Sequence, residues 1–404
     1  MPLQKVSKIT LTGMPHQLPT PSLEALRHCD ELTSLIRQRI MDAGGWIRFG
    51  DYMDLALYAS GLGYYSAGSR KFGEGGDFVT APEFSSLFSR CIATQCDEVL
   101  AQIDRGVILE LGAGTGRMAA DILLELEARD ALPERYLILE LSADLRARQQ
   151  QTLQQRVPQL AERVEWQDEL PKEPQPAVVL ANEVIDALPV ERFSITDDGL
   201  MELGVCCDDS GFGWLARPAA WDLISAVDEL QAQLGETLPA GLTSEIRLRF
   251  PAWLAELARS LQWGMLLFVD YGLSRREYYH RARTAGTLRC HYRHRAHDDP
   301  FVWPGLQDIT AWVDFSQIAN AAEREHLQVS GYTTQAQFLI AAGLDRQLER
   351  TASADLIAQV QRAGQARRLV MPGEMGETFK AMALTRGSVD PPSGFAGRDL
   401  RRVL

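Results

Sequence analysis

The sequence lacks several features that would assign it to a membrane, secreted or nucleic-acid-binding class. Its 404 residues contain no unbroken apolar run of about 18 residues, so we expect no membrane-spanning helix. The N-terminus has no basic start followed by an apolar stretch, which argues against a secretory signal. The formal net charge is −13, and an acidic surface disfavours general binding to nucleic-acid phosphates.

The six cysteines form no CxxC pair and no zinc-type spacing. We therefore expect reduced thiols in an intracellular, cytoplasmic protein. Three histidines recur at every third position after Cys290, but residues 289–295 are strongly basic and would repel a metal ion. We predict no metal site at His291, His294 and His297, and His294 is interpreted as a structural residue or a substrate-lobe contact.

Strand–helix alternation is the main pattern present. Short apolar runs predict buried strands, and the stretches between them have helical spacing. This alternation predicts an α/β fold with a Rossmann-like, parallel, doubly wound core of about seven strands. The first four strands are expected at 107–111, 136–141, 163–166 and 177–181.

A chain of this length is expected to contain a second lobe beside the core. Turn signals around Gly199 and Gly211 predict antiparallel hairpins, and residues 275–330 are irregular. We therefore expect a core interrupted by insertions that form the second lobe together with the N-terminal region. The predicted divisions are an N-terminal cleft region (1–90), the first part of the core (91–190), inserted hairpins and helices (191–260), a core strand (261–275), a second insertion (276–333), the last core helices and strand (334–390) and a tail (391–404).

A glycine-rich loop, Glu110-Leu-Gly-Ala-Gly-Thr-Gly116, links the first strand to a helix. Glycines let a ligand approach the backbone closely, and the amides of the following helix N-terminus face that ligand. A dinucleotide site needs its third glycine one position later, where this chain has Arg117. The pattern favours S-adenosylmethionine over NAD, and a purely structural turn is the alternative.

Two acidic residues follow later strands. Glu140 ends the second strand, where a carboxylate can accept both ribose hydroxyls. Asp168 follows the third strand and could receive the adenine amino group. The alternatives are an exposed strand-end glutamate and a solvated turn. With Thr80, which lies in a segment expected to reach over the cofactor, the predicted cofactor-binding residues are Glu110, Gly112, Gly114, Gly116, Glu140, Asp168 and Thr80.

Polar residues also end the fourth strand. Asn182, Glu183 and Asp186 are expected at the carboxyl edge of the sheet, where doubly wound folds bind ligands. Helix capping is the alternative for Asn182 and Asp186. Asp270, which ends the next core strand, is a similar candidate.

Several separate stretches resemble the MidA-type class I S-adenosylmethionine-dependent methyltransferase family, which includes the mitochondrial complex I assembly protein arginine methyltransferase and bacterial relatives. In this family Gly-Pro-Gly is common where the chain has Gly-Ala-Gly, and the change keeps both glycines. The resemblance implies a protein substrate methylated on arginine, with a respiratory complex subunit as a candidate, and a mitochondrial location for a eukaryotic member. The matching stretches include residues 63–65, 76–83, 110–116, 182–189, 270–272, 304–315 and 375–380.

For an arginine substrate, we expect Glu183, Asp186 and Glu83 to orient the guanidinium and accept a proton, with Asn182 in a positioning role. The alternative for Glu83 is a helix N-terminal acid. Two other functions remain open: a small-molecule methyltransferase with the same core, and an assembly factor that binds S-adenosylmethionine without catalysis. The oligomeric state is not predicted.

Overall fold

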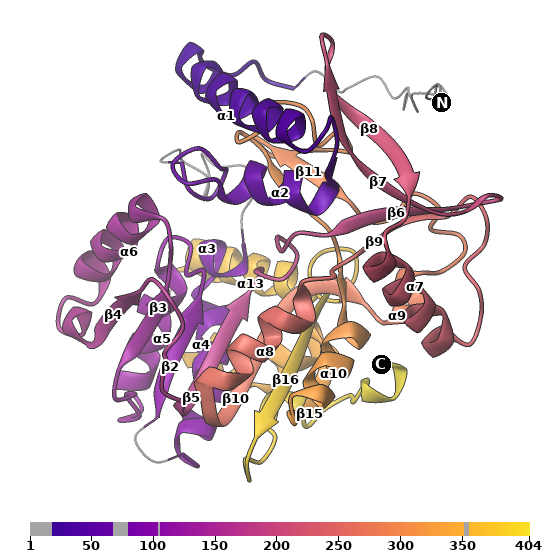
Figure 1. The fold of residues 1–404 in the computed structure, drawn as a ribbon. Helices are drawn as coiled ribbons and strands as arrows, with labels where there is room; N and C mark the ends of the chain where they lie inside the picture. The colour runs from indigo at the N-terminus through magenta and orange to yellow at the C-terminus, as the bar shows by residue number, and fades with distance from the viewer. Residues whose placement is uncertain (1–17, 68–79, 104–105, 351–354) are drawn as a thin grey trace, which may run out of the picture.

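The computed structural model describes residues 18–67, 80–103, 106–350 and 355–404, which form two lobes (Figure 1). One lobe is built on a large sheet with helices on both faces. In Figure 1 the other lobe lies above it and contains α1, α2 and the strands β6–β9. Residues 76–79, part of one stretch that resembles the methyltransferase family, lie outside the described residues.

The core sheet has eight strands within the described residues. Five adjacent strands run parallel to one another: β4 (Val164–Gln167), β3 (Tyr136–Leu139), β2 (Val107–Leu111), β5 (Gln175–Asn182) and β10 (Leu261–Leu273). The strand β16 (Phe379–Arg386) follows and runs antiparallel to both β10 and the edge strand β15 (Gln328–Thr334). The short β14 (Val313–Asp314) pairs with the end of β10. The predicted doubly wound core is confirmed.

The strand order reverses next to β2. The chain places β3 and β4 on one side of β2 and then β5 on the other. Ligands bind at such a switch point in doubly wound folds, because the connections leave the carboxyl ends of the two strands uncovered. Leu111 pairs with Ala181, so the glycine loop and Asn182 start side by side.

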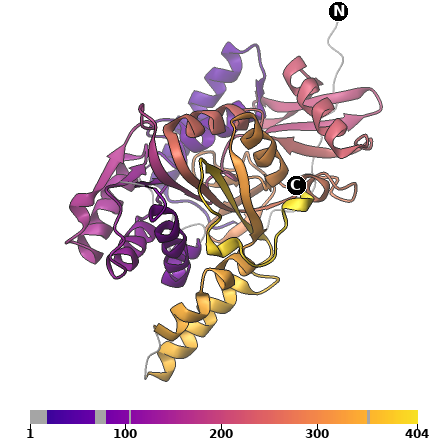
Figure 2. The same ribbon diagram turned by 90° about the horizontal axis from the view of Figure 1, so that it is seen from below.

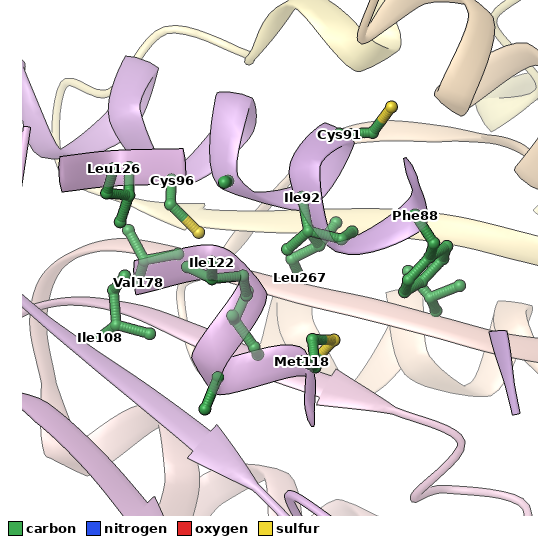
Figure 3. Close-up of a cluster of buried hydrophobic side chains, with 14 of the residues drawn as sticks. Phe88, Cys91, Ile92, Cys96, Ile108, Met118, Ile122, Leu126, Val178 and Leu267 are labelled. Atoms are coloured by element: carbon green, nitrogen blue, oxygen red, sulfur yellow. The ribbon is translucent and has the colours of Figure 1, made fainter. Parts of the chain in front are cut away.

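Helices cover both faces of this sheet because its strands are apolar on both faces. On one face lie α4 (Ser86–Leu100), α5 (Arg117–Glu127), α11 (Gln335–Ala341), α12 (Leu344–Arg350) and α13 (Leu356–Val370). Figure 3 shows side chains from two of these helices packed against strand residues: Phe88, Ile92, Cys96, Met118, Ile122 and Leu126 against Ile108, Val178 and Leu267. Each such buried side chain contributes about 1.5–3 kcal/mol.

The opposite face is covered by α8 (Phe250–Ser260) and α10 (Phe315–Arg324). The helix α6 (Ala143–Arg156) packs beside α5, next to the edge of the sheet that ends in β4. Seen from below, in Figure 2, the orange-to-yellow helices α12 and α13 extend away from the rest of the molecule. Within the described ranges, no helix combines the length and apolar character needed to cross a bilayer.

The second lobe joins the N-terminal region to the inserted segments. α1 (Leu23–Asp42), β1 (Ile47–Arg48) and α2 (Phe49–Tyr58) share one apolar cluster with strands from both insertions. This is the lobe composition predicted from the sequence. Its strands are β6 (Glu191–Thr196), β7 (Gly199–Asp208), β8 (Gly211–Pro218), β9 (Thr243–Ile246), β11 (Arg289–Tyr292), β12 (Arg295–His297) and β13 (Asp308–Thr310), and its further helices are α7 (Trp221–Leu234) and α9 (Arg275–Tyr278).

The helix α10 and all of β15 except Thr334 fall within residues 276–333, which the sequence pattern assigned to an inserted part of the second lobe. β15 extends the core sheet beyond β16, and α10 packs on α8. α8, which the sequence grouped with the inserted helices, also covers the core. The buried apolar residues of α10 (Phe315, Ile318, Ala321 and Ala322) recur at helical spacing, so the sequence carried a periodic signal for this helix that the prediction missed.

Gly264 allows close pairing between β10 and β5. Its φ is +128°, and a Cβ there would lie 2.0 Å from the carbonyl oxygen of Ala177. We expect Gly264→Ala to lower the free energy of unfolding by about 3 kcal/mol, because the backbone must shift away from a strained conformation. Gly213→Ala in β8 is the control, since its Cβ would meet nothing within 4 Å. Urea denaturation compares the two, and equal stability would contradict this account of the pairing.

Candidate active site

A cavity of about 310 Å³ opens at the carboxyl ends of β2, β3 and β5. Its volume is at the lower end of the range for small-molecule sites. The core contributes the glycine loop and the residues that follow β3 and β5. The second lobe and the segment after it contribute Tyr58, Tyr65, Thr80 and Glu83. The site is therefore shared between the two lobes.

The three glycines of the loop have different tasks. Gly112, Gly114 and Gly116 all have positive φ, at +61°, +54° and +80°, which favours glycine. Gly112 and Gly114 line the cavity, but Gly116 does not. Gly116 precedes α5, and a Cβ there would lie 3.0 Å from the Cα of Gln149. The third glycine thus serves the close approach of α6.

Two buried carboxylates lie beside the loop. Glu110 accepts a 2.7 Å hydrogen bond from the Tyr136 hydroxyl, and burial raises its pKa to about 7, with the nearby Glu140 adding to the rise. Glu140 accepts the Ser142 N–H at 2.9 Å, and burial also raises its pKa. Both carboxylates line the cavity, so its wall favours a ligand that brings hydroxyl donors or positive charge.

Gln149, which the sequence did not predict as a site residue, connects the glycine loop to the Glu140 side chain. Its amide nitrogen donates to the Gly114 carbonyl and to the Glu140 carboxylate, both at 3.0 Å. Its amide oxygen accepts the Trp166 indole N–H at 2.8 Å. Gln149 is fully buried, whereas Gln150 and Gln151 beside it are exposed. No local signal distinguishes it from those neighbours.

Asp168, which the sequence predicts to lie beside the adenine, is not among the residues that line the cavity. Its side chain is 85% exposed and pairs with Arg146 at 2.6 Å. Arg146 also donates to the backbone carbonyls of Glu140 and Gln167. The structure therefore gives Asp168 a surface ion pair with Arg146.

Asn182 and Glu183 line the cavity directly after β5. Glu183 has φ of +53°, a strained conformation for a residue with a side chain. The Asn182 amide donates to the Glu183 carboxylate at 3.3 Å, and its own oxygen is buried with no hydrogen-bond partner among the described residues. Burial raises the pKa of Glu183 to about 8, and the charge of Asp186 adds to this rise.

Asp186 and Asp270 lie behind Glu183 and outside the cavity wall. Asp270 accepts the backbone N–H groups of Ile185 at 3.0 Å and Asp186 at 3.2 Å, which holds the turn after β5. Asp186 is hydrogen-bonded by the Tyr271 hydroxyl, and burial raises the pKa of both aspartates. The predicted carboxylates therefore separate into Glu183 at the cavity and Asp186 beneath it.

Arg247 secures the same turn from the other side. It is 3% exposed, and its guanidinium donates to the carbonyls of Ile185 at 2.9 Å and Asp186 at 3.2 Å. It also donates to the carbonyls of Ala311 and Trp312. The arginine thus joins the turn after β5 to the chain after β13, a role that the sequence did not indicate.

The segment before α4, which the sequence predicts to reach over the cofactor, contacts the glycine loop. Thr80 precedes the short helix α3 (Ala81–Phe84), and both Thr80 and Glu83 line the cavity. The Thr115 hydroxyl donates to the Glu83 carboxylate, and Arg117 donates to the Glu83 carbonyl at 2.5 Å. Glu83 therefore already has a partner on the loop.

Comparison with known proteins is consistent with a ligand-binding site at this cavity. Residues 91–333 match the family model described as "Putative S-adenosyl-L-methionine-dependent methyltransferase". A crystal structure from Burkholderia thailandensis, bound to S-adenosyl-homocysteine, is 42% identical, with a TM-score of 0.91 over 96% of this chain and 100% of that chain. The mitochondrial protein arginine methyltransferase NDUFAF7 of Danio rerio is 28% identical over 84% of this chain and 83% of its own. Its Drosophila melanogaster homologue is 28% identical over 92% and 89%.

Gln149→Leu tests whether this glutamine supports the cofactor site. The variant removes the Gln149 amide donor from both the Glu140 carboxylate and the Gly114 carbonyl, and Glu140 keeps the Ser142 N–H. We therefore expect the Kd for S-adenosylmethionine to rise about tenfold or more. The matched control is Gln150→Leu, at an exposed position one residue along α6. Calorimetric titration of both variants measures the effect. An unchanged Kd in Gln149→Leu would show that Glu140 needs no such support.

Proposed function

The chain belongs to the MidA-type family of class I S-adenosylmethionine-dependent methyltransferases, and we propose that it methylates an arginine side chain of a protein substrate. The observation that carries the proposal is the Glu183 carboxylate in the wall of the cavity, backed by Asp186 and Asp270. Relatives matched over most of the chain are named protein arginine methyltransferases, which supports the same substrate class.

S-adenosylmethionine, the cofactor of the family, supplies an electrophilic methyl group on a positively charged sulfur when bound. The wall of the cavity fits such a ligand. Gly112 and Gly114 leave their backbone open, and Glu140 presents a carboxylate suited to ribose hydroxyls. Glu110 and Thr80 complete the proposed cofactor-binding side, whereas Glu83 is kept as a proposed carboxylate of the acceptor side. The pairing of acidic residues with a cationic ligand is favourable in this poorly solvated site.

The acceptor side of the proposal centres on Glu183. A guanidinium is protonated at neutral pH and is a weak nucleophile. Glu183 would orient it and draw its positive charge away from the attacking nitrogen. That nitrogen gives its lone pair to the methyl carbon, the carbon–sulfur bonding electrons remain on sulfur, and the released proton goes to Glu183. Asn182 would hold the carboxylate in place, through the hydrogen bond between their side chains.

A respiratory complex subunit, the substrate implied by the sequence resemblance, is the first candidate for the protein acceptor. The cytoplasm is the proposed location for a bacterial-type chain. The six cysteines are all free, which supports a reducing compartment.

A labelling experiment tests the function. The protein is incubated with methyl-labelled S-adenosylmethionine and a lysate from a strain that lacks it, and labelled products are identified by mass spectrometry. We expect label on an arginine of one or a few proteins. Label only in extractable metabolites would indicate a small-molecule methyltransferase. Absence of label from a protein that binds the cofactor would indicate an assembly factor without catalysis.

The raised pKa of Glu183 predicts the pH dependence of the reaction. The carboxylate is the active form, so kcat/KM for the identified substrate should rise with pH and level off above about 8. Glu183→Gln should lower kcat on the order of 100-fold and abolish this rise. Asp186→Asn removes a neighbouring negative charge and should move the rise to lower pH. An unchanged profile in both variants would exclude Glu183 as the titrating group.

A further inference from the structure

Two tyrosines of the second lobe face the same cavity as Glu183. Tyr58 ends α2 and Tyr65 lies in the following turn, and both line the cavity together with Asn182 and Glu183. The cofactor-binding side described above does not use them. They are therefore available for a second ligand that shares the cavity.

The two rings form a prearranged aromatic pair. Their centroids are 5.5 Å apart and their planes differ by 20°, so they are stacked. Tyr64 contacts the Tyr65 ring edge-on, with centroids 5.1 Å apart. Aromatic contacts of this kind hold rings in place at little entropic cost, because each side chain has few rotatable bonds.

The hydroxyl groups of both tyrosines already have partners. Tyr65 donates to the Asp308 carboxylate at 2.9 Å, and Tyr58 donates to the Ala187 carbonyl at 3.0 Å. Asp308 belongs to β13, whereas Ala187 follows β5, so the pair is anchored to both lobes. Because both hydroxyl groups are already hydrogen-bonded, the aromatic rings are the part of the pair that is available to a ligand in the cavity.

The charges around the pair favour a cation. The described residues that line the cavity include no lysine or arginine, and they include four glutamates: Glu83, Glu110, Glu140 and Glu183. A cation over an aromatic face is stabilised by the ring electrons. A guanidinium, unlike an ammonium, is planar, stacks on such a face and presents a fork of donors to a carboxylate.

We propose that Tyr58 and Tyr65 form the acceptor subsite, in which a substrate guanidinium stacks on the tyrosine pair while Glu183 binds its edge. The pair thereby selects arginine over lysine. This inference rests on the proposed function, because it names the part of the site that recognises the arginine side chain. It assigns Tyr58 and Tyr65 to specificity, separately from the carboxylate that handles the proton.

A binding experiment tests the subsite without turnover. The protein saturated with S-adenosyl-homocysteine is titrated with N-acetyl-arginine amide and with N-acetyl-lysine amide, followed by NMR. We expect the arginine compound to bind about tenfold more tightly. Tyr58→Leu and Tyr65→Leu should remove this preference, whereas Tyr58→Phe and Tyr65→Phe keep the rings and should retain it. Unchanged affinity for S-adenosyl-homocysteine shows that each variant is folded.

Two results would overturn the subsite. One is a wild-type protein that binds both compounds equally, and this result does not depend on whether the leucine variants fold. The other is a folded leucine variant that keeps the preference for arginine. Either result leaves the proposed function standing if the lysate experiment labels arginine. If that experiment labels no arginine while the titration shows the expected preference, the methyl transfer is wrong and the cation subsite is right.

Discussion

The proposed acceptor site depends on the turn after β5, which Asp270 holds by accepting two consecutive backbone N–H groups. Arg247 binds the carbonyls of the same two residues, so donors and acceptors of the turn are both satisfied from buried side chains. This support keeps Glu183 in a left-handed conformation that costs on the order of 1–3 kcal/mol. Without this support from Asp270 and Arg247, the turn would not hold the Glu183 carboxylate toward the cavity.

The same arrangement explains the electrostatic character of the site. Glu183, Asp186 and Asp270 are close together and poorly solvated, so each disfavours the charge of the others. Such a cluster of buried carboxylates contributes little to the stability of the fold. Its presence is explained if its ligands are cations. Arg247 offsets part of this negative charge at Asp186 and Asp270, and a sulfonium or a guanidinium in the cavity would add positive charge beside Glu183. Binding of the two cations would then reduce the electrostatic repulsion among these carboxylates.

The two lobes contribute different residues to the site because of where they lie. The core supplies the glycine loop, Glu140 and Glu183, all placed by strand ends. The second lobe supplies the tyrosine pair, which is bonded to Asp308 on its own side and to Ala187 on the core. The lobe combines N-terminal and inserted segments in one apolar cluster.

The sequence by itself determined the parallel core, the glycine loop, and the placing of Glu140, Asn182 and Glu183 at the cavity, because each of these follows a strand end along the chain. Only the tertiary structure decided the burial of Gln149, the exposure of Asp168, the place of Asp186 behind the wall and the stacking of Tyr58 on Tyr65. Local periodicity reports which face of an element is apolar. The direction and partner of a polar side chain depend on packing between segments far apart in sequence.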